Sequence, residues 1–410
     1  MKLQVRIVLI LLLSLFLIVP EITAAGMMNY SSGSASVTGP GIAESTPSIG
    51  GVSVYPADDI WNVPVDQLPV DPHSAAYIQK IGSTAYLHPD FGAGLYDGSL
   101  MGIPYNIVSG STPKKTVTFD YADESDPGPY PIPDHPLIEG GSDEHILIID
   151  RDSKILYELY AAEKQTDGSW HAGSGSVFNL SDYQLRPAGW TSADAAGLPI
   201  LPGLVRYDEA ANGSINHAIR FTAPSTQKAY VWPARHYASS ITDPSYPPMG
   251  ERFRLKTSFN TSGYSPQARV ILDALKKYGM ILADNGAPWY ITGAPDDGWN
   301  NDILHTLQQV KGSDFEAVDS SSLMISPDSG QARVSLSVVT FPGTALSPTD
   351  PDHDGLYEDA NGNGRLDFTD VVLFFKNIAW IGGHEPVAAF DFNHNGSIDF
   401  NDLVLLFRKL

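Results

Sequence analysis

The sequence contains no cysteine among its 410 residues. This absence excludes disulfide bonds, thiolate catalysis and metal sites built on cysteine. The fold must therefore be stabilised mainly by a hydrophobic core. Hydrophobic residues make up 42% of the chain, which is enough to form such a core at this length.

Basic residues are scarce as well. The chain has 25 Lys and Arg residues against 47 Asp and Glu residues, which gives a formal net charge of -22 at pH 7. A charge of this sign opposes binding to nucleic acid and to anionic lipid. We therefore expect no nucleic-acid partner and, at most, a peripheral association with membranes.

Long apolar runs are missing after the first residues of the chain. Residues 7–19 form the apolar run IVLILLLSLFLIV, which follows the basic segment MKLQVR and precedes the small residues of EITAAG. This order is typical of a cleaved secretory signal, whereas an uncleaved membrane anchor usually needs a longer run. The sequence predicts a signal peptide over residues 1–25 and an extracellular or cell-surface location.

Most named catalytic motifs are also missing. The chain has no HExxH motif, no GxSxG motif, no phosphate-binding loop and no GxGxxG before a helix. A zinc protease, an α/β-hydrolase with a serine nucleophile and a nucleotide-binding enzyme are therefore not supported.

Two twelve-residue segments, DANGNGRLDFTD at 359–370 and DFNHNGSIDFND at 391–402, repeat one pattern of oxygen-bearing side chains around a glycine. Ca²⁺ takes six to eight oxygen ligands, and a twelve-residue loop that turns at its sixth residue brings them together. The predicted ligands of the first loop are Asp359, Asn361, Asn363, the backbone carbonyl of Arg365, Asp367 and Asp370. Those of the second loop are Asp391, Asn393, Asn395, the backbone carbonyl of Ser397, Asp399 and Asp402. The alternative is a pair of solvated turns, since Asp and Asn favour turns anyway.

Each loop leads directly into an apolar segment, VVLFFKNI or LVLLFRKL, and no obvious helix precedes either loop. In this arrangement residues 350–410 resemble a dockerin domain, and Asp370 and Asp402 match the family's habit of ending the calcium loop in Asp. The resemblance implies calcium-dependent folding and attachment of a secreted polysaccharide-degrading enzyme to a cohesin. Positions ten and eleven hold Phe and Thr or Phe and Asn, where small hydroxylated or basic pairs are typical. The expected partner is therefore either a cohesin-like module or another cell-surface protein.

Three further acidic residues stand at alternate positions just before the first loop. They are Asp350, Asp352 and Asp354. This spacing is compatible with a third calcium site and equally with an acidic hinge.

The remainder of the chain divides by composition. Residues 26–54 are rich in Ser, Gly, Pro and Thr and predict a linker, and residues 320–349 predict a second linker with an edge strand at 332–341. Between them, residues 55–319 form the main domain. Hairpins are predicted at 145–164, with a third strand at 170–180, at 215–236 and at 280–293, and helices at 265–279 and 300–310. The predicted fold is mainly β, an antiparallel sandwich or jelly-roll-like body with one or two packed helices.

The candidate active site of the main domain is the Gly- and Pro-rich segment 186–209, together with residues near strand ends on either side. Long irregular segments in strand-rich domains often bind ligands. The candidate catalytic residues are Asp194, Glu209, His171 and His236. The candidate substrate-binding residues are Trp190, Arg206 and Arg235. The alternative is structural: Asp194 caps a turn, Arg206 pairs with Glu209, and the tryptophans belong to the core.

Two functions of different classes follow. The first is a secreted carbohydrate-active enzyme in which two carboxyls hydrolyse a glycosidic bond, or a His and Arg pair acts on an acidic sugar as a lyase. The second is a non-catalytic cell-surface or matrix protein that binds glycan or another protein. The segments GWTSADAAGLPILPGLVRYDE and YVWPARH resemble those of uncharacterised secreted prokaryotic proteins, and this resemblance supplies no mechanism.

Overall fold

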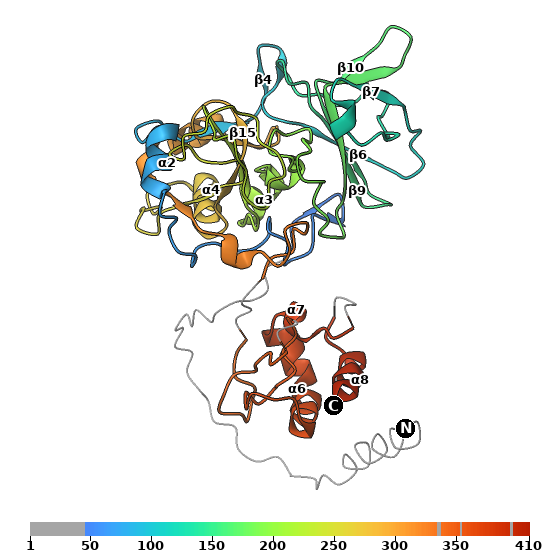
Figure 1. Cartoon of the computed structure of the whole chain (residues 1–410), viewed down its shortest axis with the longest axis vertical. Helices are drawn as coiled ribbons and strands as arrows, with labels where there is room; N and C mark the ends of the chain where they lie inside the picture. The colour runs from blue at the N-terminus through green and yellow to red at the C-terminus, as the bar shows by residue number, and fades with distance from the viewer. Residues whose placement is uncertain (1–45, 334–337, 353–354, 394–396) are drawn as a thin grey trace. The chain divides into compact units, whose positions relative to one another are not determined.

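The computed structural model describes residues 46–333, 338–352, 355–393 and 397–410 (Figure 1). The predicted signal peptide, most of the first predicted linker, residues 334–337 of the predicted edge strand, Asp354 and Asn395 lie outside the described residues. None of the described helices is both long and apolar enough to cross a membrane.

The main domain is built around a mixed six-stranded sheet in the order β17-β14-β15-β13-β16-β3. Its strands are β3 (His88–Asp90), β13 (Ile219–Ala223), β14 (Arg252–Leu255), β15 (Met280–Asn285), β16 (Tyr290–Thr292) and β17 (Phe315–Val318). β13 runs parallel to β15, and β3 runs parallel to β16, while the other pairs are antiparallel. All four residues of β14 and the first four of β15 are buried, so the centre of this sheet is covered on both faces.

A second, four-stranded sheet has the order β12-β9-β8-β6. Its strands are β6 (Tyr105–Val108), β8 (Ile146–Asp150), β9 (Ile155–Tyr160) and β12 (Ser174–Asn179). The predicted hairpin and its third strand are confirmed, because β8 pairs antiparallel with β9 and β12 pairs antiparallel with β9. Alternate residues face different cores: Leu147 and Ile149 belong to the main core, whereas Ile146 and Ile148 belong to a smaller one.

Short strands complete the β structure. β7 (Val117–Phe119), β10 (Glu163–Lys164) and β11 (Trp170–Ala172) form a three-stranded sheet in the order β10-β11-β7, and its Val117 and Trp170 close the smaller core. β4 (Leu95–Tyr96) and β5 (Ser99–Leu100) form a hairpin. The sheets of the main domain are thus several and mixed, and the mainly β prediction is confirmed.

Four helices lie in the main domain: α2 (Ser74–Ile81), α3 (Tyr207–Asn212), α4 (Pro266–Lys277) and α5 (Asn301–His305). α4 follows its prediction closely. Ser265 has the extended backbone of an N-cap, Pro266 lies in the first turn, and Gly279 has a φ of +64° just beyond the end. Ile271 and Leu275 are buried on one face of the helix. Short 3₁₀ turns are η2 (Ala122–Glu124), η3 (Leu201–Gly203), η4 (Thr306–Gln309), η5 (Gly312–Asp314) and η6 (Ser321–Leu323).

The limits of the main domain differ from the predicted ones. β1 (Ser48–Ile49) and β2 (Val52–Ser53) form a hairpin through two glycines with positive φ, and Ile49 and Val52 are buried in the core. A two-residue turn of this kind suits glycine, which made the segment resemble a linker by composition. At the other end, Ala332 is buried and Gln331 bridges to Asp59, so the domain extends beyond residue 319.

Two predicted hairpins are wrong in their pairing. β13 forms, but residues 228–236 contribute only an isolated bridge at Tyr230, because Pro233 lacks the N–H that a ladder requires. β15 and β16 both form, yet each pairs with β13 and not with the other. β13 therefore sits between two strands that follow it in sequence, a non-local arrangement that hairpin rules do not foresee.

The C-terminal tail contains α6 (Phe368–His384), α7 (Val387–Phe390) and α8 (Phe400–Lys409). α6 and α8 contact each other, and the tail has its own core, in which Phe374, Phe390 and Leu406 are fully buried. Each long helix begins directly at the end of one twelve-residue loop. The predicted order, a loop followed by a helix, is therefore observed in both units.

Candidate functional site

The first twelve-residue loop is organised around its last residue, Asp370, whose side chain is fully buried. Oδ1 of Asp370 accepts hydrogen bonds from the backbone N and from Nδ2 of Asn361, at 3.1 and 2.7 Å. Its Oδ2 accepts from the backbone N of Asp367 at 2.7 Å, while Asp367 accepts from Thr369 N at 2.8 Å. This reciprocal capping box starts α6 and joins the two ends of the loop through one carboxylate.

The first residue of the same loop, Asp359, is also fully buried. It accepts hydrogen bonds from the backbone N of Asn363 at 3.0 Å and of Gly364 at 2.7 Å. Gly364 has a φ of +86°, a left-handed conformation that glycine adopts without strain and that reverses the chain at position six. The backbone N of Arg365 donates to Oδ1 of Asn363 at 3.1 Å, while the Arg365 side chain is exposed.

The second loop repeats this frame. Oδ1 of Asp402 accepts from Asn393 N at 3.1 Å, and its Oδ2 accepts from Asp399 N at 2.7 Å. Asp399 in turn accepts from Asn401 N at 2.7 Å and caps α8. Asp391 is buried like Asp359 in the first loop. The predicted ligands Asn393, Asp399 and Asp402 thus occupy positions equivalent to those of the first loop, and Ser397 is exposed beside them.

The electrostatics of both loops favour a bound cation. Burial raises the pKa of Asp370, and the negative charges of Asp359 and Asp367 add to that effect. Burial likewise raises the pKa of Asp402, with Asp391 and Asp399 contributing. Side-chain oxygens that repel one another in a confined loop are stabilised when a divalent cation lies between them, and an all-oxygen donor set suits Ca²⁺. The residues present therefore fit calcium.

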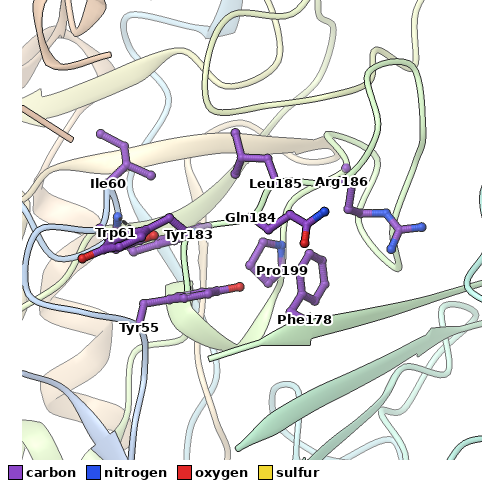
Figure 2. A pocket seen from close by; sticks show the side chains of 11 residues that line it. Tyr55, Ile60, Trp61, Phe178, Tyr183, Gln184, Leu185, Arg186 and Pro199 are labelled. Carbon is purple, nitrogen blue, oxygen red and sulfur yellow. Dashed lines mark hydrogen bonds between the residues drawn. The ribbon is translucent and has the colours of Figure 1, made fainter. Parts of the chain in front are cut away.

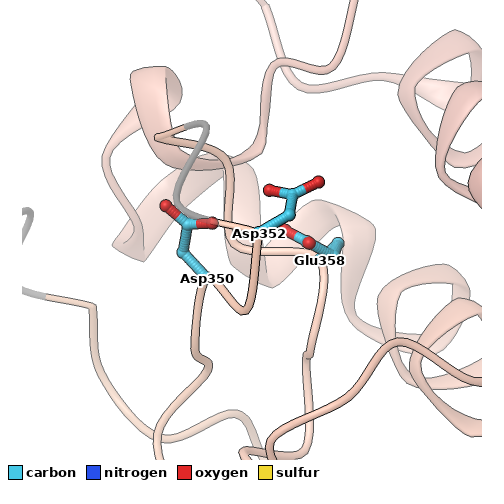
Figure 3. Close-up of side chains that lie close together, drawn as sticks. All are labelled: Asp350, Asp352 and Glu358. Carbon is cyan, nitrogen blue, oxygen red and sulfur yellow. The ribbon is translucent and has the colours of Figure 1, made fainter.

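A third acidic cluster precedes the first loop. Carboxylate oxygens of Asp350, Asp352 and Glu358 all lie within 4.8 Å of one another (Figure 3). Sequence analysis missed Glu358, which is buried and stands outside the alternating pattern of aspartates. Nζ of Lys409 lies 3.7 Å from Oδ2 of Asp352, so the cluster has one positive neighbour.

In the main domain, the candidate catalytic residue Asp194 is buried and paired. Its Oδ2 and Oδ1 accept hydrogen bonds from Nε and Nη2 of Arg220, at 2.6 and 2.8 Å. Only 1% of Asp194 is exposed, and Ala195 N donates to the same carboxylate at 3.1 Å. A carboxylate held in this way supports the local fold and has no open side from which a substrate could approach.

Glu209, the second candidate carboxylate, is held in the same manner. Arg206 Nη2 lies 2.7 Å from its Oε1, and His217 Nε2 lies 3.0 Å from its Oε2. Burial alone would raise the pKa of Glu209, but the charges of His217 and Arg206 outweigh burial and lower it. The geometry therefore argues against a cleft with Asp194 and Glu209 as a catalytic pair, and the pairing of Arg206 with Glu209 follows the structural alternative.

Arg235 lies beside the segment of Asp194, since its backbone N donates to Ala196 O at 2.8 Å, whereas His171 lies in β11. Arg235 is buried and donates to the backbone oxygens of Arg186 and Pro327, both at 2.6 Å, which makes it a structural link. Both ring nitrogens of His171 have partners, Thr118 Oγ1 at 2.9 Å and Asp120 Oδ1 at 3.1 Å.

Trp190 and His236 remain near the surface of the main domain. The guanidinium carbon of Arg186 lies 5.6 Å from the centre of the Trp190 ring, which is half-buried. Nδ1 of His236 bonds Ala195 O at 2.9 Å, and its Nε2 lies 3.9 Å from Oε2 of Glu124.

Sequence analysis missed a partly exposed carboxyl next to the buried pair. Asp284, in β15, lies 3.3 Å from Nη2 of Arg220, and 28% of its side chain is exposed. Burial raises the pKa of Asp284 above its usual range, and the charge of Asp194 raises it further. Its place near the end of the predicted strand 280–285 was the only sequence signal.

A small cavity lies elsewhere in the main domain (Figure 2). Figure 2 shows the side chains of Tyr55, Trp61, Phe178 and Pro199 around it, with Arg186 at one end. Asp59 also lines the cavity. Burial raises the pKa of Asp59 to about 8, so this carboxyl is protonated at neutral pH.

Comparison with known proteins gives one match. Residues 357–410 match the family model of the dockerin type I domain. Neither curated proteins nor solved structures yielded a match, so residues 46–333 have no family assignment from these comparisons. The match covers both twelve-residue loops and the helices α6, α7 and α8. The C-terminal tail of this chain is therefore a dockerin type I domain.

Proposed function

We propose that the chain is a secreted calcium-binding protein whose dockerin domain attaches the β-rich main domain to a cohesin-like partner. Dockerin modules bind calcium and occur in secreted proteins of the cellulosome type. The observation that carries the proposal is the repeated hydrogen-bond frame around Asp370 and Asp402, which places the same groups in both loops.

Calcium would act through folding. Each closing carboxylate joins the loop to the first turn of a helix, so an ion bound there stabilises loop and helix together. The ligands would be those named in each loop, with Arg365 and Ser397 contributing backbone carbonyls. Without the ion, the buried carboxylates of each loop would repel one another, and the first turns of α6 and α8 would be destabilised.

For the main domain we propose a role in handling polysaccharide, as a hydrolase or lyase carried by the dockerin domain. A non-catalytic glycan- or protein-binding role is the second candidate. One observation favours it: the side chains of Asp194 and Glu209, the carboxyls first considered for catalysis, are only 0% and 11% exposed, and both are held in ion pairs with arginine.

Docking is tested with the full-length protein on an immobilised type I cohesin module. We expect retention in calcium, loss of retention in EDTA, and recovery on adding calcium back. The variant Asp370→Ala/Asp402→Ala should lose retention. The control Asp134→Ala, which changes a side chain that is 94% exposed in the main domain, should not.

Retention that ignores EDTA would contradict the calcium mechanism. Calcium-dependent folding without binding to any cohesin would instead favour another cell-surface partner. Export is tested by N-terminal sequencing of the secreted protein, which should begin near residue 26. Activity is tested on a panel of polysaccharides by reading new reducing ends for a hydrolase and unsaturated products for a lyase.

A further inference from the structure

A series of contacts on the main domain links several segments around Asp284 into one surface patch. The patch begins at β15, where Asn285 Nδ2 donates to Ala238 O at 2.8 Å and so connects Asp284 to residues 236–238. His236 in that segment bonds Ala195 O, next to Asp194, and its Nε2 approaches Glu124 at 3.9 Å. The end of β15 is thereby connected, through residues 236–238, to Glu124 of the turn η2.

Further hydrogen bonds connect the residue before η2 to the end of β9. Tyr121, the residue before η2, donates its backbone N to Gly173 O at 2.9 Å, and Gly173 N donates to Tyr160 O at 2.8 Å. Tyr160 is the last residue of β9. Burial raises its pKa, and the charges of Asp143 and Asp284 add to that effect, so both carboxyls lie in its neighbourhood. Segments far apart in the sequence therefore surround one patch.

The side chains of this patch are aromatic and acidic, and several are exposed. Tyr121 is 55% exposed and Tyr237 is 37% exposed, while Tyr160 is half-buried. Between them, 31% of the Glu124 side chain and 28% of the Asp284 side chain reach solvent. The ring of Tyr237 stacks on that of His236, with centroids 5.6 Å apart, and still keeps its exposed surface. Exposed tyrosines contribute little to a core and suit contact with a ligand.

We propose that the surface formed by Tyr121, Glu124, Tyr160, His236, Tyr237 and Asp284 binds a neutral saccharide. Tyrosine rings offer flat apolar faces to the C–H groups of a sugar ring. Carboxyl groups and the imidazole offer hydrogen bonds to its hydroxyls. This inference rests on the polysaccharide role proposed above and assigns that role to one surface.

The charge of the surface decides between neutral and acidic sugars. Asp120 and Asp143 are exposed nearby and add negative charge to that of Glu124. The guanidinium of Arg220 is buried and already held by Asp194, Asp284 and Thr292, so it cannot neutralise a uronate.

Lys228, 5.9 Å from the ring of Tyr237, is one exposed cation beside these carboxylates. The carboxylates Asp120, Glu124 and Asp143 outnumber this lysine, so a uronate polymer would be repelled, whereas a neutral polymer would not.

The test is affinity electrophoresis of the calcium-loaded full-length protein in gels containing one polysaccharide each. The matched probes are hydroxyethylcellulose and carboxymethylcellulose, which share a backbone and differ in charge. Xylan, mannan and dextran extend the neutral set, and polygalacturonate extends the acidic one. We expect retardation by at least one neutral polymer and none by the acidic polymers.

Variants locate the surface. Tyr121→Ala should weaken binding to the retarding polymer by about tenfold, the loss of one stacked ring. Asp284→Asn should change the pH dependence of binding, because its carboxyl titrates at this surface. The matched control is Tyr86→Ala, which removes a tyrosine of nearly equal exposure, 54%, elsewhere on the main domain and should leave affinity unchanged.

Equal effects of Tyr121→Ala and Tyr86→Ala, or stronger retardation by the acidic polymers, would overturn the inference. If the protein binds or cleaves a polysaccharide and every surface variant behaves as wild type, this site is wrong and the proposed function stands. If no neutral polymer binds while cohesin docking remains, the surface and the polysaccharide role both fail, and the calcium-dependent docking is unaffected.

Discussion

Replacing Asp194 by asparagine separates a structural carboxylate from a catalytic one. The substitution keeps the shape of the side chain but removes the charge that faces Arg220, which is 5% exposed. Arg220 would keep Thr292 at 2.8 Å and Asp284 at 3.3 Å, but it would lose the two-point contact at 2.6 and 2.8 Å. Removing one partner of a buried pair typically costs about 3–5 kcal/mol. Because the asparagine oxygen can still accept one hydrogen bond, we expect about 3 kcal/mol.

A loss of this size should lower the melting temperature of the main domain by roughly 5–10 °C. The measurement is calorimetry of the full-length protein at pH 7 in saturating calcium, which keeps the tail folded. Asp134→Asn is the control, because its 94% exposed carboxylate lies 3.4 Å from Lys115 and should contribute less than about 0.5 kcal/mol. If Asp194→Asn melts like wild type but abolishes action on a polysaccharide, the structural reasoning is refuted and the catalytic assignment returns.

Four other substitutions probe separate parts of the chain. Asp370→Ala and Asp402→Ala should each remove one calcium ion from the stoichiometry measured by calorimetric titration, and a variant that still binds both ions would contradict the assigned closing ligands. Burial raises the pKa of Asp59 from 3.8 to about 8, so the unfolded chain releases this proton first. Stability should therefore fall by about 1.4 kcal/mol per pH unit between roughly pH 4 and 8 on account of this group. In chemical denaturation Asp59→Asn should remove that slope, and an unchanged slope would show that Asp59 is ionised in the fold. Gly279→Ala should destabilise the main domain by more than about 1 kcal/mol in the same assay, because the residue has a φ of +64° and a Cβ would meet Phe253 O at 2.2 Å; wild-type stability would mean that the turn after α4 adapts.

The parts of the fold that sequence analysis predicted are local in the chain. The β8–β9 hairpin, α4 and the two calcium loops each depend on residues within about twenty positions, where periodicity and turn chemistry act directly. The central position of β13 depends on strands that arrive some sixty residues later, and the N-terminal hairpin was hidden by its glycines. Pairing between distant strands leaves no short-range pattern to recognise.

The distinction between local and distant contacts also explains which candidate site residues the sequence alone can identify. A calcium loop carries all its ligands within twelve residues, so position alone identifies them. Whether Asp194 is exposed depends on Arg220, which approaches from β13, and on Asp284 from β15. Charge density in a Gly- and Pro-rich segment predicted a ligand surface, but the segment lies over the sheet and its charges are paired. Sequence reasoning ranked the residues by chemical type, whereas their roles follow from burial.

The charges of buried acidic residues are balanced differently in the main domain and in the dockerin domain. In the main domain, Asp194 and Glu209 are neutralised by arginines of the same domain, so their burial needs no added ion. In the dockerin domain, Asp359 and Asp370 are fully buried beside other carboxylates and amides, and the same holds for Asp402 in the second loop. Their hydrogen bonds come from backbone and amide N–H groups and, at Asp359, also from the Thr349 hydroxyl, none of which carries a net charge that could cancel the repulsion. A divalent cation is the partner that such a set lacks, and the energy of binding it becomes energy of folding. Fold and docking in the tail should accordingly depend on external calcium, while the main domain should keep its structure in its absence.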